Sequence, residues 1–118
     1  MCGPPAVASL AIMFVLELTY TAPLDRVDAL AAEHHAWVDD HFAAGTFIAS
    51  GRKKPRDGGV ILAVGDDRAA VEARVAADPF VVGGVCAYRI TEFAVARTAP
   101  GLAQYREQRP PRWPPTGE

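Results

Sequence analysis

Apolar residues divide the chain into strand-like and helix-like stretches. Residues 13–20 alternate, with Phe14, Leu16, Leu18 and Tyr20 on one face, which predicts a half-buried strand. Three further strands are predicted at residues 46–51, 60–64 and 85–95. The stretch 60–64 is apolar throughout, so it should lie in the middle of a sheet.

A long helix is predicted between the first two strands, from Leu24 to Ala44. Pro23 suits its first turn and Gly45 ends it. At helical spacing one stripe of this helix, which should face the core, carries Val27, Leu30, Ala31, His34, Trp37, Val38 and His41. Two of its histidines therefore lie on the face expected to be buried.

A second helix is predicted at residues 67–77, with Asp66 as its N-cap and Pro79 ending it. Its inward face would present Val71, Val75 and Asp78.

These elements occur in the order β-α-β-β-α-β, which predicts an α+β, ferredoxin-like fold: a four-stranded antiparallel sheet with two helices on one face. The other face needs cover, and a second copy of the chain would supply it, giving a homodimer. We expect an N-terminal extension at 1–12, one domain at 13–97 and a flexible or draped proline-rich tail at 98–118.

Composition narrows the class of protein. The 118 residues are 50% apolar with a net charge of −2, which favours one globular domain and gives no global field for nucleic acid or an anionic membrane. The apolar run at 6–16 is too short to span a bilayer. With only Cys2 and Cys86, no disulfide framework is expected, so a reduced, cytoplasmic setting fits best.

Several short motifs, in this order and spacing, resemble the YCII-related (YciI-like) family over residues 13–95. They are Ala32-Glu33-His34 with Gly45, Ser50-Gly51, the loop Pro55-Arg56-Asp57-Gly58-Gly59, and Asp78-Pro79-Phe80. The resemblance implies a dimeric α+β barrel with a His–Asp pair acting as general acid and base on small molecules. By position the pair falls on His34 and Asp78. Family members commonly have Gly-Pro where this chain has Gly51-Arg52, so we expect a more basic pocket rim here.

The chemistry of the two side chains agrees with that role. An imidazole transfers protons near neutral pH, and a carboxylate on one ring nitrogen fixes its tautomer. Each residue also has a structural alternative. His34 could be a core histidine bonded to a backbone carbonyl, and Asp78 before Pro79 is typical of an N-cap.

Other residues are candidates for substrate binding. Arg52 or Lys53 could hold a substrate anion, beside Ser50 and Gly51, whereas Lys54 and Arg56 are expected at a solvated loop tip. Tyr20 and Trp37 could line an apolar pocket or simply fill the core. His35 and His41 lack the ligand spacing of a metal site, so neither a metal nor a cofactor is predicted.

The sequence therefore predicts a cofactor-free acid/base enzyme, a lyase or isomerase, acting on a small anionic or phenolic metabolite. One alternative is a non-catalytic protein of the same fold that binds a small ligand or serves as an accessory subunit, and another is a purely structural dimerisation module.

Overall fold

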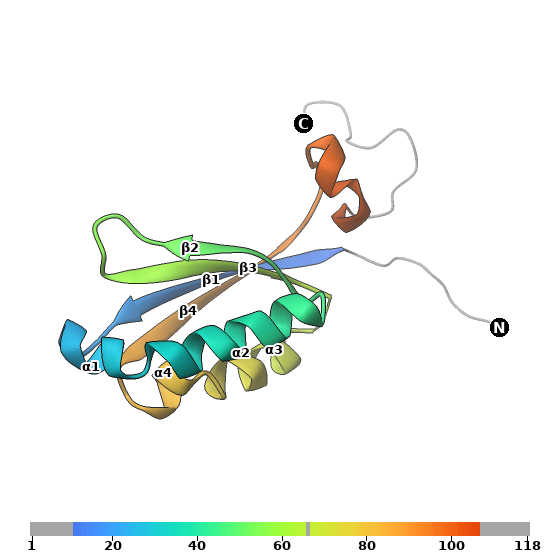
Figure 1. The fold of residues 1–118 in the computed structure, drawn as a ribbon. Helices are drawn as coiled ribbons and strands as arrows, with labels where there is room; N and C mark the ends of the chain where they lie inside the picture. The colour runs from blue at the N-terminus through green and yellow to red at the C-terminus, as the bar shows by residue number, and fades with distance from the viewer. Residues whose placement is uncertain (1–10, 66, 107–118) are drawn as a thin grey trace.

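The computed structural model describes residues 11–65 and 67–106, and its centre is a four-stranded antiparallel sheet (Figure 1). The strands lie in the order β2-β3-β1-β4, which confirms the predicted ferredoxin-like arrangement. Their bounds are Ile12–Tyr20 (β1), Phe47–Arg52 (β2), Gly58–Val64 (β3) and Cys86–Ala94 (β4). The apolar strand β3 lies inside the sheet, as predicted, and β1 begins one residue earlier than predicted.

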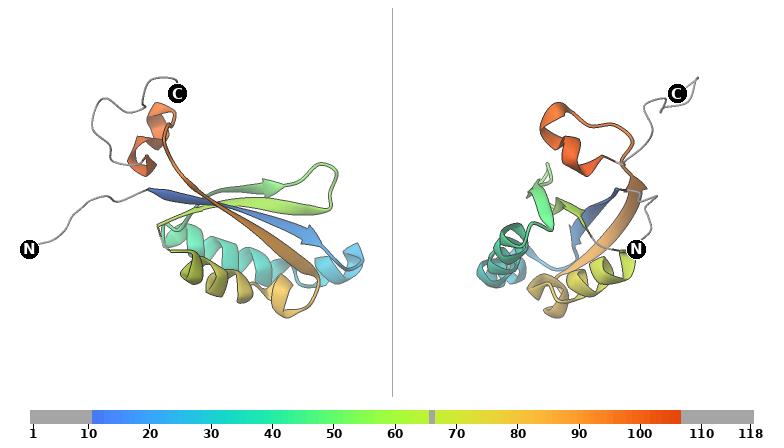
Figure 2. Two further views of the ribbon diagram at one scale, coloured as in Figure 1. Left: turned by 180° about the vertical axis from the view of Figure 1, so that it is seen from behind. Right: turned by 90° about the vertical axis from the view of Figure 1, so that its right-hand side faces the viewer.

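The four α-helices among the described residues pack on one face of the sheet (Figure 2). They are α1 (Leu24–Ala29), α2 (Ala31–Ala43), α3 (Arg68–Ala76) and the single turn α4 (Pro79–Val82). The core lies between these helices and the sheet. There Phe14 and Leu16 of β1 are fully buried in one cluster with Val71 and Val75 of α3.

The prediction of one continuous helix from Leu24 to Ala44 is wrong at Leu30. The N–H of Leu30 bonds to the carbonyl of Val27, three residues back, and its φ and ψ of −107° and 2° end α1 there. The side chain of Leu30 then packs at the end of α4, where a Cβ on Gly83 would overlap it. No change in the apolar periodicity marks this break.

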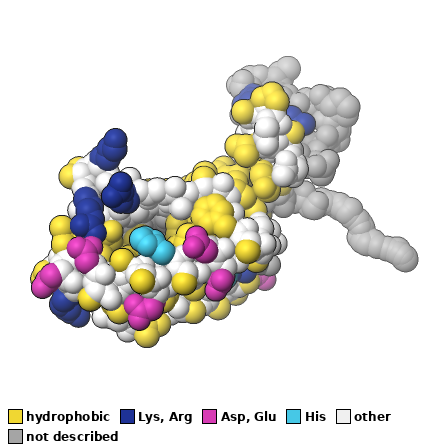
Figure 3. All heavy atoms as spheres, in the orientation of Figure 1, with side chains coloured by type: hydrophobic (Ala, Val, Ile, Leu, Met, Phe, Trp, Pro, Cys, Tyr) yellow, Lys and Arg dark blue, Asp and Glu magenta, His cyan; other side chains and the backbone are white. Residues whose placement is uncertain are grey.

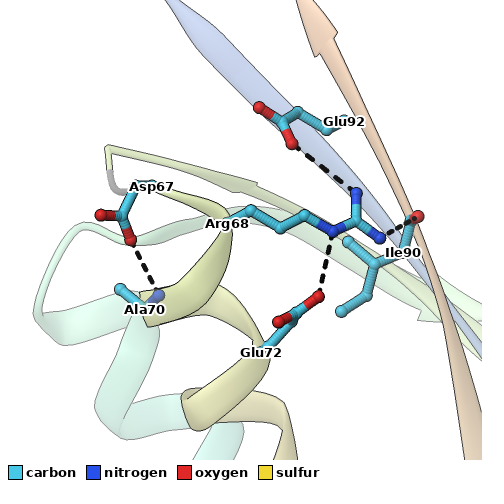
Figure 4. A network of polar contacts seen from close by, with 6 residues as sticks. All are labelled: Asp67, Arg68, Ala70, Glu72, Ile90 and Glu92. Atoms are coloured by element: carbon cyan, nitrogen blue, oxygen red, sulfur yellow. Dashed lines mark hydrogen bonds and ion pairs between the residues drawn. The ribbon is translucent and has the colours of Figure 1, made fainter.

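Helix α3 is capped by Asp67, whose side chain accepts a hydrogen bond from the N–H of Ala70 at 2.9 Å. The predicted cap was Asp66, which lies outside the described residues. Arg68 ties the start of α3 to the neighbouring edge strand β4 (Figure 4). Its guanidinium contacts Glu72 at 3.0 Å, Glu92 at 3.6 Å and the carbonyl of Ile90 at 3.3 Å.

The second face of the sheet is covered at one end by the chain that follows β4. Residues Pro100–Tyr105 form a 3-10 helix, η1, on the side away from the α-helices (Figures 1 and 2). Tyr105 packs there against Met13, Val64 and Val95. Of the predicted tail, the described part at 98–106 contacts the sheet through Tyr105. The remainder lies outside the described residues, as do Cys2 and most of the predicted extension. In the described part of the chain, every helix is too short or too polar to cross a membrane.

Candidate active site

A pocket of about 490 Å³ opens between helices α1 and α2 and the strands β1, β2 and β3. In the space-filling view histidine side-chain atoms border this hollow, and Lys and Arg side chains gather over the end of the β2–β3 hairpin (Figure 3). Its wall is largely apolar, formed by Leu18, Tyr20, Val27, Val38, Ile61 and Phe80. Its polar side chains are those of Asp28, His34, His35, Ser50, Arg52 and Arg56.

The structure brings His34 and Asp78 together, although 44 residues separate them in the sequence. His34 projects from the buried side of α2, and its Nδ1 lies 2.8 Å from Oδ1 of Asp78. The Asp78 carboxylate is completely buried behind the imidazole, and His34 itself lines the pocket. The partner of His34 is therefore a carboxylate rather than the backbone carbonyl of the structural alternative.

Asp78 is also the N-cap of α4, as its position before Pro79 indicates. Its Oδ1 accepts a second hydrogen bond from the N–H of Phe80 at 2.9 Å. The two interpretations of this residue are thus compatible, because one carboxylate oxygen accepts from both the helix end and the imidazole. The cap fixes the carboxylate in place for His34.

Tyr88 of β4 completes the surroundings of Asp78 and was not found by sequence reasoning. Its hydroxyl donates to Oδ2 of Asp78 at 2.6 Å. Burial, with the Asp78 carboxylate beside it, raises the pKa of Tyr88 well above its usual range, so the phenol keeps its proton and donates. The alternation of side chains along β4 puts Tyr88 on the inner face of the sheet, but it gives no reason to pair Tyr88 with Asp78.

Phe80 holds the imidazole ring in plane. The rings of His34 and Phe80 are stacked, with centroids 4.0 Å apart and an angle of 6° between their planes. The Asp78-Pro79-Phe80 segment thus supplies a carboxylate to the edge of the imidazole and an aromatic ring to its face.

The hydrogen-bond geometry assigns the tautomer of His34. Asp78 accepts from three donors, as an ionised carboxylate can, so His34 Nδ1 carries the proton that faces it. In the neutral ring the lone pair then lies on Nε2, which has no hydrogen-bond partner within residues 11–65 and 67–106. The arrangement suits a general base that becomes an acid once it has taken up a proton.

Four of the five residues predicted to bind substrate line the pocket, namely Tyr20, Ser50, Gly51 and Arg52. Trp37 does not. Its ring packs beside the imidazole of His34 and against His41 and Phe47, with centroids 5.9, 5.0 and 5.4 Å away. Trp37 therefore supports the helix that carries His34.

The basic side chains of residues 52–56, between β2 and β3, point to different faces of the sheet. Lys53 turns away from the pocket, and its Nζ contacts Glu17 and Thr19 at 3.2 and 3.1 Å. Arg56, expected at a solvated tip, is exposed and also lines the pocket, where it pairs with Asp28 of α1 and lies over the ring of Tyr20. Pairing across the β2–β3 hairpin decides these directions, which composition does not encode.

The remaining histidines differ from His34 in their surroundings. His35 is exposed at the pocket, and half-buried His41 packs against Phe47. Burial, with Arg74 nearby, lowers the pKa of His41, against a smaller opposite effect of Asp40. Across residues 11–65 and 67–106, no group of three or more His, Cys, Asp or Glu side chains is placed to hold a metal ion.

The fold and the pocket define a small α+β protein with a buried His–carboxylate pair. The family model of the YCII-related domain matches residues 13–94, most of the chain, so the chain belongs to the YCII-related family. No curated protein sequence matches it significantly.

Solved structures resemble this chain at low sequence identity. One is 5-chloro-2-hydroxyhydroquinone dehydrochlorinase (TftG) from Burkholderia phenoliruptrix AC1100, in complex with 2,5-dihydroxybenzoquinone. It has a TM-score of 0.58 and 19% identity, over 70% of this chain and 94% of that one. Another is SnoaB, a cofactor-independent oxygenase from Streptomyces nogalater, with a TM-score of 0.43 and 19% identity over 75% and 96% of the two chains. The likeness to TftG confirms the predicted fold class.

Proposed function

We propose that this protein is a cofactor-free enzyme that transfers protons on a small anionic or phenolic metabolite. The reaction is an elimination, such as dehydration or dehydrohalogenation, or an isomerisation. The proposal is carried by one observation. An imidazole on the pocket wall has one ring nitrogen bonded at 2.8 Å to a fully buried carboxylate.

In this mechanism His34 Nε2 removes a proton from a carbon or hydroxyl of the substrate. The electron pair released forms a double bond and expels a leaving group from the adjacent carbon, or it moves the double bond in an isomerisation. The resulting imidazolium returns the proton to the leaving group or to a different carbon. Asp78 stabilises the imidazolium and keeps its ring oriented, while Tyr88 and the Phe80 N–H hold Asp78.

The pocket wall supports a ring-shaped substrate. Tyr20 and Phe80 offer aromatic surfaces, and Ser50, Gly51 and Arg52 supply polar groups from the end of β2. The ligand in the TftG complex, 2,5-dihydroxybenzoquinone, is a hydroxylated ring of this kind and is a suitable probe.

We also propose that the protein is cytoplasmic and forms a homodimer. The dimer would form through the sheet face opposite the helices. Residue pairing places Val15, Leu62 and Phe93 on that face, opposite the helices. Val15 and Leu62 are half-buried and Phe93 is 41% exposed, while η1 covers only one end. A second sheet packed here would remove this apolar surface from water.

Proton exchange tests the acid/base function without knowledge of the natural substrate. The protein is incubated in deuterated buffer with 2,5-dihydroxybenzoquinone and related hydroxyquinones, and exchange at ring carbons is followed by NMR. We expect exchange above the buffer rate with wild type, and its loss in His34→Ala and His34→Gln. Halide release from chlorinated hydroxyhydroquinones, with no cofactor added, tests elimination directly.

His41→Gln is the matched control, because it removes an imidazole from the same helix at a position away from the pocket. We expect exchange as in wild type, with circular dichroism showing that every variant is folded. Equal exchange in wild type and both His34 variants would contradict the proposal. Ligand binding without any exchange would favour the non-catalytic alternative.

A further inference from the structure

Two arginines line the pocket, and they differ in whether an acidic side chain neutralises them. Arg56 is paired with Asp28, and its guanidinium carbon lies 5.9 Å from the centre of the Tyr20 ring. Arg52, at the end of β2, is exposed and lines the same pocket. In the described part of the chain its side chain makes no hydrogen bond or ion pair. The rim therefore offers a ligand one guanidinium without a partner.

From this we infer that the pocket selects ring-shaped ligands with a single negative charge, which Arg52 binds while Asp28 withholds Arg56 from a second charge. The inference deepens the proposed function by naming its substrate class, and it rests on that function for the reacting group. It makes Arg52, Asp28 and Arg56 specificity-determining residues.

The buried carboxylate sets the orientation of such a ligand. Asp78 lies directly behind His34, so its negative charge opposes an anionic group placed against the imidazole. The ligand's anionic group is therefore favoured at the Arg52 end of the pocket. Its ring then lies along the apolar wall formed by Leu18 and Ile61, with the group that gains or loses a proton toward His34.

The Asp28–Arg56 pair is what limits the charge. It connects α1 to the β2–β3 loop, and both side chains are about half exposed, so it is a pair that substitution can break without leaving a charge buried. A second ligand carboxylate would have to replace Asp28 as the partner of Arg56. Such an exchange of one carboxylate for another gains little.

Binding of simple benzene derivatives tests the inference, by calorimetry at about pH 8, above the ordinary pKa of histidine. Benzoate carries one charge, benzamide none, and phthalate, isophthalate and terephthalate two. For wild type we expect benzoate to bind roughly five-fold more tightly than benzamide, and no dicarboxylate to bind more tightly than benzoate.

Arg52→Gln should abolish the preference for benzoate over benzamide. Lys54→Gln is the matched control, since Lys54 has the same charge on the adjoining loop and does not line this pocket. Asp28→Asn should release Arg56, so that at least one dicarboxylate binds roughly five-fold more tightly than benzoate. Adding Arg56→Gln to Asp28→Asn should remove that gain.

Three results would overturn the inference: no binding of benzoate by wild type at millimolar concentration, an unchanged preference in Arg52→Gln, or unchanged dicarboxylate affinity in Asp28→Asn. His34→Gln separates this inference from the proposed function. Loss of proton exchange with the benzoate preference retained supports both. If wild type shows the preference but no exchange, the function fails and the charge selection stands.

Discussion

At the scale of single residues, the Asp78 carboxylate holds the site together because it accepts hydrogen bonds from three different donors. It caps α4, orients His34 and accepts from Tyr88, with no exposed surface of its own. Removing any one donor leaves a lone pair without a partner inside the protein, where water cannot replace it. Tyr88 is the donor whose removal changes the fewest other contacts.

We expect Tyr88→Phe to lower the free energy of unfolding by about 2 kcal/mol at neutral pH, because the buried Asp78 loses a hydrogen bond. The raised pKa of Tyr88 makes this difference depend on pH. The unfolded phenol loses its proton above its usual pKa of 10.0, whereas the folded one keeps it. The stabilising contribution is therefore full below about pH 10 and shrinks as the pH rises further.

Urea unfolding of both proteins across this pH range measures the effect. Tyr105→Phe, a change in a tyrosine packed on the second face of the sheet, should stay within about 0.5 kcal/mol of wild type. A Tyr88→Phe variant as stable as wild type at neutral pH would show that the Tyr88–Asp78 bond contributes nothing.

At the scale of elements, the site depends on how closely β1 and β3 approach where the pocket begins. Gly58 starts β3 opposite Thr19, with a φ of +157°, and a Cβ there would overlap the carbonyl oxygen of Leu18. That oxygen belongs to the backbone of the central strand, so it can move only if the pairing of the strands is disturbed. Glycine is thus required by close approach as well as by conformation.

Gly58→Ala is expected to lower the free energy of unfolding by about 3 kcal/mol, through strain and weakened β1–β3 pairing. Thermal and urea denaturation measure the loss. Gly101→Ala is the matched control, because a Cβ at Gly101 meets no atom within 4 Å. Equal stability of the two variants would contradict the close approach described here.

At the scale of the whole molecule, the sheet face opposite the helices is largely uncovered in the single chain. The helices cover one face and η1 covers one end of the other (Figure 2). Half-buried Val15 and Leu62, with exposed Phe93, remain on the second face. Apolar side chains grouped on one face of a sheet are typical of an interface.

For wild type we expect a mass of twice the 12.6 kDa chain in light scattering and in sedimentation. Phe93→Glu should shift the protein toward the monomer by placing a charge in the interface. Val82→Glu should leave the mass unchanged, since Val82 is 74% exposed but lies on α4, in the helix layer. A monomeric wild type, or dissociation by Val82→Glu alone, would refute the proposed interface.

The sequence determined what local periodicity encodes. The order of the four strands and of the main helices, the inward positions of His34 and Asp78, and the N-cap at Asp78 follow from spacing and from the residues at helix ends, whereas the break between α1 and α2 does not. A resemblance in short motifs was needed to pair His34 with Asp78, because nothing in the spacing states that residues 44 positions apart will meet.

Only the tertiary structure decided which side chains converge. The packing of α2 against α4 joined the imidazole to its carboxylate, and the register of β4 brought the Tyr88 hydroxyl to Asp78. Pairing in the β2–β3 hairpin sent Lys53 to one face of the sheet and Arg56 to the other. Such outcomes depend on how whole elements pack and pair, and a local pattern of apolar residues carries no information about a partner far along the chain.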